Sequence, residues 1–217
     1  MSRVTLTFDN GPEPEVTPRV LDILARHDVL STFFVLGRKM ADPGRFAVAG
    51  RAHAGGHWIG NHTWSHETPL GLSADPLAAE KEIGETQKAL GRLAHPDRLF
   101  RPFGQGGNLD ARILSPGARD YLIVGGYSCV LWNSVPGDWK DGDGWYAQGL
   151  LDVASRDWTL MVLHDLPGAC IDRLDDFIKA LLDAGIEIVQ DFPPACVPIL
   201  KGEFVRPDAM PALDDAA

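Results

Sequence analysis

Three histidines and one aspartate are the residues of this 217-residue chain whose types and spacing best suit hydrolytic chemistry. His62 and His66 are four positions apart, so on one helical turn their imidazoles would face the same way and share a metal ion. Asp9 suits a general base that takes a proton from water, and His164 suits a general acid that protonates a leaving group. Together they suit a site at which a metal assists the attack of water.

Each of these residues also has an ordinary structural explanation. A bare pair of histidines at this spacing is more often a surface or capping pair, and Asp9 precedes a turn and a helix that it would cap. A lone histidine such as His164 is commonly a core residue with its hydrogen bonds satisfied. Arg101 is either a surface ion-pair former or the residue that orients a carboxylate. Trp132 and Trp139 are either core aromatics or the wall of a sugar site.

The elements that must position these side chains alternate along the chain. Apolar runs predict strands at residues 4–8, 32–36, 58–61, 98–101, 128–132, 159–163 and 187–189. Helical periodicity predicts helices at residues 17–27, 45–54, 77–93, 109–121, 145–155 and 171–184, with a break at Pro116. The alternation indicates an α/β fold with a parallel sheet, and the chain length favours a small, distorted (β/α) barrel of about seven parallel strands.

The candidate residues follow the predicted strands. Asp9, His62, Arg101 and His164 come directly after strands, and Asp138 comes shortly after another. The carboxyl ends of the strands of a parallel barrel open on one face, where active sites lie. We therefore expect these residues to converge in space.

Residues 1–191 are expected to form one domain. Residues 192–217 are rich in proline and lack periodicity, so they are expected to form a C-terminal strap or tail with a loose acidic end.

Composition restricts the partners. The formal net charge is -10, which disfavours a nucleic-acid partner and an anionic membrane surface and is compatible with a neutral carbohydrate. Cys129, Cys170 and Cys196 are odd in number and far apart, so three reduced, mostly buried thiols are expected. The N-terminal sequence lacks the apolar segment of a secretory signal, and a cytoplasmic location is expected. The oligomeric state is not set by these patterns.

Five short motifs follow one another between residue 5 and about residue 189. They are 7–12 (TFDNGP), 61–66 (NHTWSH), 100–104 (FRPFG), 132–139 (WNSVPGDW) and 161–164 (MVLH). Together they resemble the motifs of the polysaccharide deacetylase family, also called the NodB-homology domain of carbohydrate esterase family four. The resemblance covers nearly the whole chain.

The resemblance implies a metal-dependent hydrolase that removes N-acetyl groups from an amino-sugar oligosaccharide or polysaccharide. By resemblance, Asp9 is the catalytic base, Arg101 holds it, and His164 is the acid, tuned by Asp138. The remaining implied roles are metal binding, with zinc expected, by Asn10, His62 and His66, and substrate binding by Phe103, Trp139 and Leu163.

Three positions depart from the family pattern. Asn10 stands where the family has a second aspartate, so the metal site loses a negative charge and its affinity for zinc-like ions should fall. Arg101 and Pro102 are adjacent where the family usually has a residue between them, which would shift the backbone that binds an oxyanion. Val135 stands where the family has a further carboxylate. Two alternatives follow: a metal-independent amidohydrolase acting on a small amide or ureide, or a non-catalytic carbohydrate-binding relative.

Overall fold

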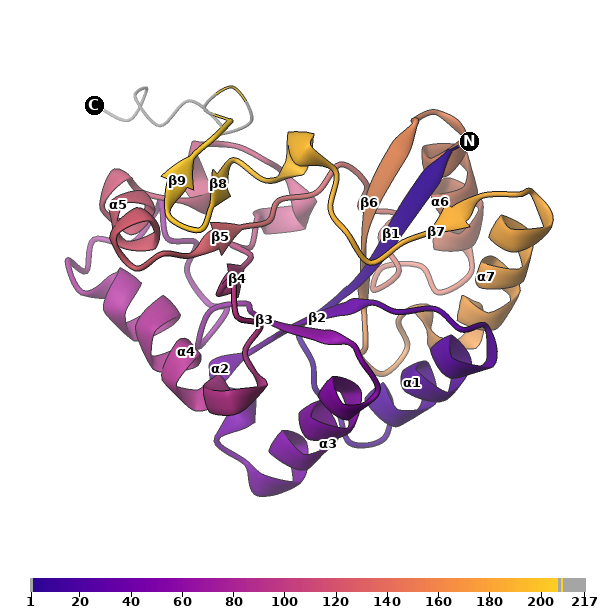
Figure 1. Ribbon diagram of the computed structural model, residues 1–217, viewed down its shortest axis with the longest axis horizontal. Coiled ribbons are helices and arrows are strands. Elements are labelled where there is room, and N and C mark those ends of the chain that lie inside the picture. The colour runs from indigo at the N-terminus through magenta and orange to yellow at the C-terminus, as the bar shows by residue number, and fades with distance from the viewer. Residues whose placement is uncertain (1, 207, 209–217) are drawn as a thin grey trace.

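A parallel sheet surrounded by helices forms the centre of the molecule. The structure, a computed structural model, describes residues 2–206 and 208, and Figure 1 shows the helices around the outside of the strands. The parallel strands are β1 (Arg3–Asp9), β2 (Thr32–Val35), β3 (Trp58–Asn61), β4 (Leu99–Phe100), β5 (Ser128–Cys129), β6 (Trp158–His164) and β7 (Glu187–Ile188). The α-helices are α1 (Thr17–Arg26), α2 (Gly37–Met40), α3 (Pro43–Ala54), α4 (Glu85–Leu90), α5 (Pro116–Val124), α6 (Gly144–Ala154) and α7 (Leu174–Asp183).

The sheet curls into a half-barrel, so the predicted small, distorted (β/α) barrel is confirmed. Its strand order is β6-β1-β2-β3-β4-β5-β8-β9, where β8 is Ile199–Leu200 and β9 is Glu203–Phe204, and β7 pairs with β1 off this path. The pairs among β1 to β7 are parallel, as expected from strand–helix alternation. The register of β1 against β6 sets Asp9 beside His164, which brings the two predicted proton-transfer residues together.

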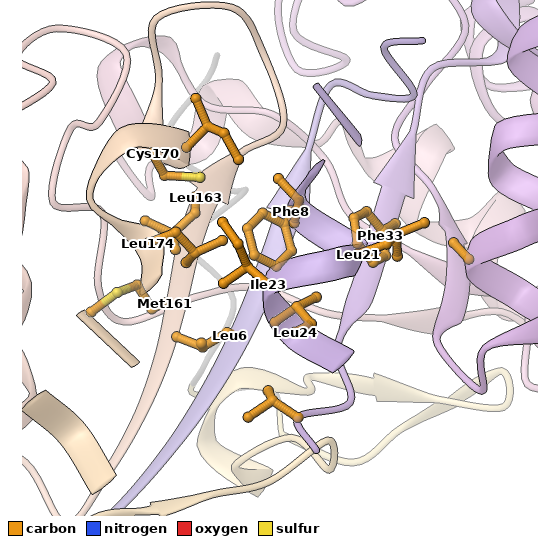
Figure 2. Packing of buried hydrophobic residues seen from close by; sticks show 14 of the residues in the cluster. Leu6, Phe8, Leu21, Ile23, Leu24, Phe33, Met161, Leu163, Cys170 and Leu174 are labelled. Atoms are coloured by element: carbon orange, nitrogen blue, oxygen red, sulfur yellow. The ribbon is translucent and has the colours of Figure 1, made fainter. Parts of the chain in front are cut away.

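Strand β1 shows how the sheet separates a core from a site. Successive side chains of a strand point to opposite faces, and Leu6 and Phe8 pack into the main hydrophobic cluster with side chains of α1 and α7. Figure 2 shows Leu6 and Phe8 beside Ile23 and Leu24 of α1. Each such buried side chain contributes about 1.5–3 kcal/mol to folding. The alternate residues Thr5, Thr7 and Asp9 are polar and lie on the other face, toward the barrel interior, although they are also buried.

Two helices illustrate why the sequence folds locally as it does. In α1, Val20, Leu21, Ile23 and Leu24 are buried, which is the one-sided pattern that the sequence predicts. In α3, the Asp42 side chain accepts a hydrogen bond from the Arg45 N–H and caps the helix, which begins at Pro43 rather than at the predicted residue 45.

The predicted helix at residues 77–93 is not uniform. It contains a π-helical turn, η1 (Glu80–Gly84), followed by α4 and by the 3-10 turn η2 (Gly91–Leu93). The predicted helix at 109–121 is likewise divided into the 3-10 turn η4 (Ala111–Ile113) and α5, because Pro116 begins a new helix capped by Ser115. The further 3-10 turns are η3 (Gln105–Gly107), η5 (Cys170–Asp172) and η6 (Pro194–Cys196).

Residues 192–206 contain strands that their sequence pattern does not predict. β8 (Ile199–Leu200) pairs antiparallel with β5 and with β9 (Glu203–Phe204), so this segment extends the sheet beside β5 (Figure 1). The acidic end predicted to be loose lies at 209–217, outside the described residues. Among the residues that the structure describes, no helix is both long enough and apolar enough to cross a membrane.

Candidate active site

The predicted convergence of strand ends is confirmed by a pocket of about 390 Å³. Asp9 ends β1, His62 follows β3, and His164 ends β6, so three strands deliver these residues to one cavity. The predicted site residues that line it are Asp9, Asn10, His62, His66, Phe103, Trp139 and His164. Arg101 and Asp138 are fully buried behind them and act on the lining residues through hydrogen bonds.

Arg101 holds Asp9 from inside the barrel. Its Nη1 donates to Asp9 Oδ1 at 2.8 Å and to Thr7 Oγ1 at 2.7 Å, and its Nε donates to the Val130 carbonyl at 3.2 Å. The guanidinium also lies 4.0 Å from the ring centroid of Phe34. Such a buried cation is tolerated because its donors have partners. One oxygen of Asp9 is therefore fixed, and the other faces His62.

His62 is fixed in one tautomer. Its Nδ1 lies 2.9 Å from the Arg101 carbonyl oxygen, which only accepts, so Nδ1 carries the proton. Nε2 then has a free lone pair and lies 3.5 Å from Asp9 Oδ2. Burial lowers the pKa of His62, and the Asp9 charge offsets this only in part. A neutral imidazole whose other nitrogen is held by a carbonyl is the form that binds a metal.

His66 reaches the pocket from a loop, so the predicted helical turn is wrong. Thr63 and His66 have left-handed backbones, with φ of 68° and 58°, which no α-helix contains. The ring of His66 stacks on Phe103 at 3.9 Å between centroids and lies 5.0 Å from the ring of His62. Burial lowers the pKa of His66 to about 3. The two histidines still meet, but loop geometry brings them together.

Asn10 stands beside the histidines with an unused oxygen. Its Oδ1 is buried and has no hydrogen-bond partner, and the residue lines the pocket. Its backbone has a φ of 73° and its carbonyl accepts from Lys39 Nζ at 2.7 Å. Within residues 2–206 and 208, no group of three His, Cys, Asp or Glu side chains is arranged to hold a metal ion. Two imidazoles and this orphaned amide oxygen are nevertheless a donor set that fits a divalent cation.

His164 is paired with a carboxylate on the opposite side of the pocket. Asp138 accepts from the His164 backbone N–H at 2.8 Å, and His164 Nδ1 lies 2.8 Å from the other oxygen of Asp138. Burial lowers the pKa of His164, but the hydrogen bond and charge of Asp138 outweigh it, so the pKa is raised above 6.5. Nε2 of a ring held in this way is the nitrogen left to donate a proton into the cavity.

Aromatic side chains form the walls of the pocket. Trp139 is 39% exposed and meets His164 edge-on at 4.7 Å between ring centroids, while Phe103 is almost fully buried. Trp132 lines the pocket as well, and its Nε1 donates to the Gly107 carbonyl at 2.9 Å. Gly107 has a φ of 83°, and a side chain there would meet Val135. The valine that replaces a family carboxylate therefore packs against the glycine-rich wall.

Leu163 does not contact the pocket, so the prediction that it binds substrate is wrong. It is fully buried in the main hydrophobic cluster, and Figure 2 shows it near Phe8 and Leu174. Side chains alternate along a strand, so the residue that shares a face with His164 is two positions earlier. Val162 is that residue, and it lines the pocket. The strand period was the signal that would have found it.

Asp165 is a buried carboxylate that the sequence did not single out. It accepts a hydrogen bond from Thr17 Oγ1 and lies against Gly11, where any side chain would collide with it. Burial raises its pKa to about 7. Asp165 thus packs beneath the turn that carries Asn10.

Comparison with known proteins places this pocket in a family. The polysaccharide deacetylase model matches residues 1–114, just over half of the chain. The chain belongs to the polysaccharide deacetylase family. It is 34% identical over 197 residues to a chitooligosaccharide deacetylase of Sinorhizobium fredii, covering 88% of this chain and 84% of that protein. The family resemblance carried by the five motifs is thereby confirmed.

Two further likenesses bear on this polysaccharide deacetylase domain. The crystal structure of the Bc1960 peptidoglycan N-acetylglucosamine deacetylase superposes with a TM-score of 0.72 at 29% identity, covering 87% of this chain and 85% of that one. The peptidoglycan-N-acetylmuramic acid deacetylase PdaC of Bacillus subtilis is 30% identical over 188 residues, which is 86% of this chain. The chain spans only 37% of the length of that relative.

Proposed function

We propose that this protein hydrolyses the N-acetyl group of an amino sugar in an oligosaccharide or polysaccharide, with the help of a divalent cation. The proposal rests on one observation: two ion pairs of different kinds face each other across the pocket. Asp9 is held by Arg101 on one side, and His164 is held by Asp138 on the other. This pairs a group ready to accept a proton with a group ready to donate one.

The chain's own residues account for the proton transfers of such a hydrolysis. Asp9 takes a proton from water as the water oxygen forms a bond to the acetamide carbon. His164 then gives a proton to the sugar nitrogen as the carbon–nitrogen bond breaks. Asp138 stabilises the charged form of His164 before that step, and Arg101 keeps Asp9 aimed at the cavity. The products are acetate and a free amino sugar.

His62, His66 and Asn10 would hold the cation. A bound divalent ion there would lower the pKa of water and polarise the acetamide carbonyl. The lowered pKa values of both histidines favour this assignment, because a ligand must be a neutral imidazole. The buried, unpartnered oxygen of Asn10 supports it as well.

The pocket suits an uncharged sugar. Trp139 offers an aromatic face to the apolar side of a pyranose ring, and Val162 offers an apolar surface to an acetyl methyl group. The names of the relatives, which are chitooligosaccharide and peptidoglycan deacetylases, support the same substrate class.

One observation favours a second candidate, a metal-independent amidohydrolase acting on a small amide or ureide. In the described part of the chain, the two histidines have no carboxylate partner arranged to complete a metal site. The same proton-transfer pairs would serve that reaction. A non-catalytic carbohydrate-binding role is disfavoured, because a binding pocket has no use for a positioned base and a positioned acid together.

Acetate release is the direct test. Purified protein is stripped of metal and incubated with acetylated chitooligosaccharides, muropeptide fragments and small amides, with zinc, with cobalt and with a chelator. Cation-stimulated acetate release from an acetylated sugar is expected, and Asp9→Asn serves as the inactive control. Release that is equal with the chelator would favour the second candidate. Absence of release from every acetylated sugar under all conditions would contradict the proposal.

A further inference from the structure

The loop that carries His62 and His66 adopts a backbone that its own residues disfavour. Thr63 and His66 both have left-handed φ values, and for a β-branched residue such as Thr63 this region is rarely occupied. Strained conformations of this kind persist only where surrounding contacts determine them. The contacts that hold this loop come from Asn61, from α2 and from η1, the π-helical turn over Glu80–Gly84.

Glu82 of this turn makes the central contacts. Its Oε2 accepts from the backbone N–H groups of Trp64 and Ser65, both at 2.9 Å, and its Oε1 accepts from Ser65 Oγ at 2.8 Å. Ser65 Oγ in turn accepts from the Glu67 N–H at 3.2 Å. One carboxylate is therefore connected to the backbone on both sides of His66.

Neighbouring contacts also hold this loop, most of them at its start. Asn61 donates from its amide to the Ile83 carbonyl at 2.9 Å, and its Oδ1 accepts from the Thr63 N–H at 3.0 Å. The Gly37 N–H donates to the Thr63 carbonyl at 3.0 Å. These bonds hold the loop near His62. In the segment that leads to His66, the Arg38 N–H donates to the Trp64 carbonyl at 3.2 Å, and three further bonds are to the carboxylate of Glu82. The bonds to Glu82 are charge-assisted and so stronger than neutral ones.

We propose that Glu82 is a positioning residue that sets His66 against His62 and thereby determines how tightly the pocket binds a divalent cation. The inference rests on the proposed cation-dependent function. Glu82 is not among the pocket-lining residues, so it acts through the loop. Partners one step removed from metal ligands typically change metal affinity about 10- to 100-fold when they are lost.

The same helical segment offers a matched control. Glu85 is one turn further along, is half exposed and pairs with Lys88 at 2.7 Å on the surface. Removing Glu85 changes the net charge as much as removing Glu82 but leaves the loop untouched. The comparison of Glu82→Ala with Glu85→Ala therefore separates loop positioning from a general effect of charge.

Cobalt binding to the metal-free, full-length protein, followed by calorimetry, tests the proposal. Glu82→Ala is expected to weaken Co²⁺ binding about 10- to 100-fold. Glu82→Gln keeps the shape and an acceptor oxygen but loses the charge that strengthens these bonds, so its cobalt affinity should lie between those of Glu82→Ala and the wild type, while Glu85→Ala should match the wild type. Glu82→Ala with wild-type cobalt affinity would overturn the proposal.

Amide hydrogen exchange gives a readout that needs neither cation nor substrate. Exchange of the Trp64 and Ser65 N–H groups should be faster in folded Glu82→Gln than in the wild type, while amides of β1 exchange as before. If the wild type binds no cobalt, the proposed cation site fails, and these two amides alone decide the role of Glu82. Unchanged exchange of both amides in Glu82→Gln would overturn the proposed role of Glu82. This test remains available if Glu82→Ala does not fold.

Discussion

The histidines on the two sides of the pocket differ in the direction of their pKa shifts. On one side, burial lowers the pKa of His62 and lowers that of His66 to about 3. On the other side, burial acts in the same direction on His164, but the contact with Asp138 raises its pKa above the ordinary value. The same ring in the same cavity is thus kept neutral on one side and favoured as a cation on the other.

The difference depends on which carboxylate is free to act. Asp9 lies near His62, but Arg101 already binds it, and the charge of Arg101 itself lowers the pKa of His62. In the part of the chain that the structure describes, no lysine or arginine pairs with Asp138, which gives both oxygens to His164. Asp138 therefore outweighs the effect of burial on the pKa of His164, whereas Asp9, bound by Arg101, does not do so for His62. Neutral rings suit a metal, and a protonated ring suits an acid.

Exchanging the two kinds of histidine for alanine is expected to produce the largest effects. His164→Ala should lower the rate of acetate release on the order of 10²–10⁴-fold, because the general acid is lost, while cobalt affinity stays near that of the wild type. His66→Ala should lose cobalt binding first and activity as a consequence. Calorimetry with cobalt and acetate assays on both variants measure the contrast. Equal loss of cobalt binding in both variants would remove the distinction between the two sides.

Removing the charge of Asp138 should favour the neutral form of His164, as burial does for His62 and His66. Asp138→Asn is expected to lower the pKa of His164, because burial is then opposed only by the smaller effects of the Asp9 and Asp165 charges. In the wild type, charged His164 adds stability that is fully present below its unfolded pKa of 6.5 and is lost as the pH rises through the higher folded pKa. Asp138→Asn should not show this loss of stability as the pH rises.

The titration of His164 by NMR and the melting temperature across neutral and alkaline pH measure this change. Acetate release by Asp138→Asn should fall by about tenfold or more near neutral pH, since less of the acid is protonated. Asp165→Asn is unsuitable as a control because Asp165 supports the Asn10 turn. A wild-type pKa for His164 in Asp138→Asn would show that Asp138 only orients the ring.

A negative charge at position 10 should strengthen the binding of a cation at the proposed site of His62 and His66. Asn10→Asp is expected to tighten cobalt binding by about tenfold, because a carboxylate replaces a neutral oxygen, and aspartate tolerates the left-handed backbone found here. Asn10→Gly is the matched control: it also accepts that backbone but removes the oxygen, so it should weaken binding. Identical cobalt affinities in the three proteins would place residue 10 outside the cation site.

Sequence patterns predicted those parts of the site that depend on strand ends. Asp9 and His164 end strands, His62 and Arg101 directly follow strands, and parallel strands bring their carboxyl ends to one face. That rule needs only the order of elements, which periodicity shows. The pairing of Arg101 with Asp9, which was expected from the family resemblance, is also present.

Other parts depend on contacts that no local pattern records. The left-handed turns at Thr63 and His66 follow from hydrogen bonds to Glu82 and Asn61, so an assumed helical turn misplaced that loop. The hairpin of β8 and β9 consists of two-residue strands, too short to show an alternation, and it is fixed by the pairing of Cys129 with Ile199 far along the chain. In such cases tertiary partners select the local structure.

The smallest expected effects come from substitutions on the two faces of β6, at Val162 and at Leu163. Val162→Ala should raise KM for an acetylated sugar about fivefold, equal to about 1 kcal/mol, because contact with the acetyl group is lost at the pocket wall. Leu163→Val should leave KM unchanged and lower the free energy of unfolding by about 1 kcal/mol, the cost of one buried methylene. Steady-state kinetics and urea unfolding of both variants measure the two effects. A KM change in Leu163→Val without one in Val162→Ala would mean that the face of β6 that contacts substrate is the one packed against α7.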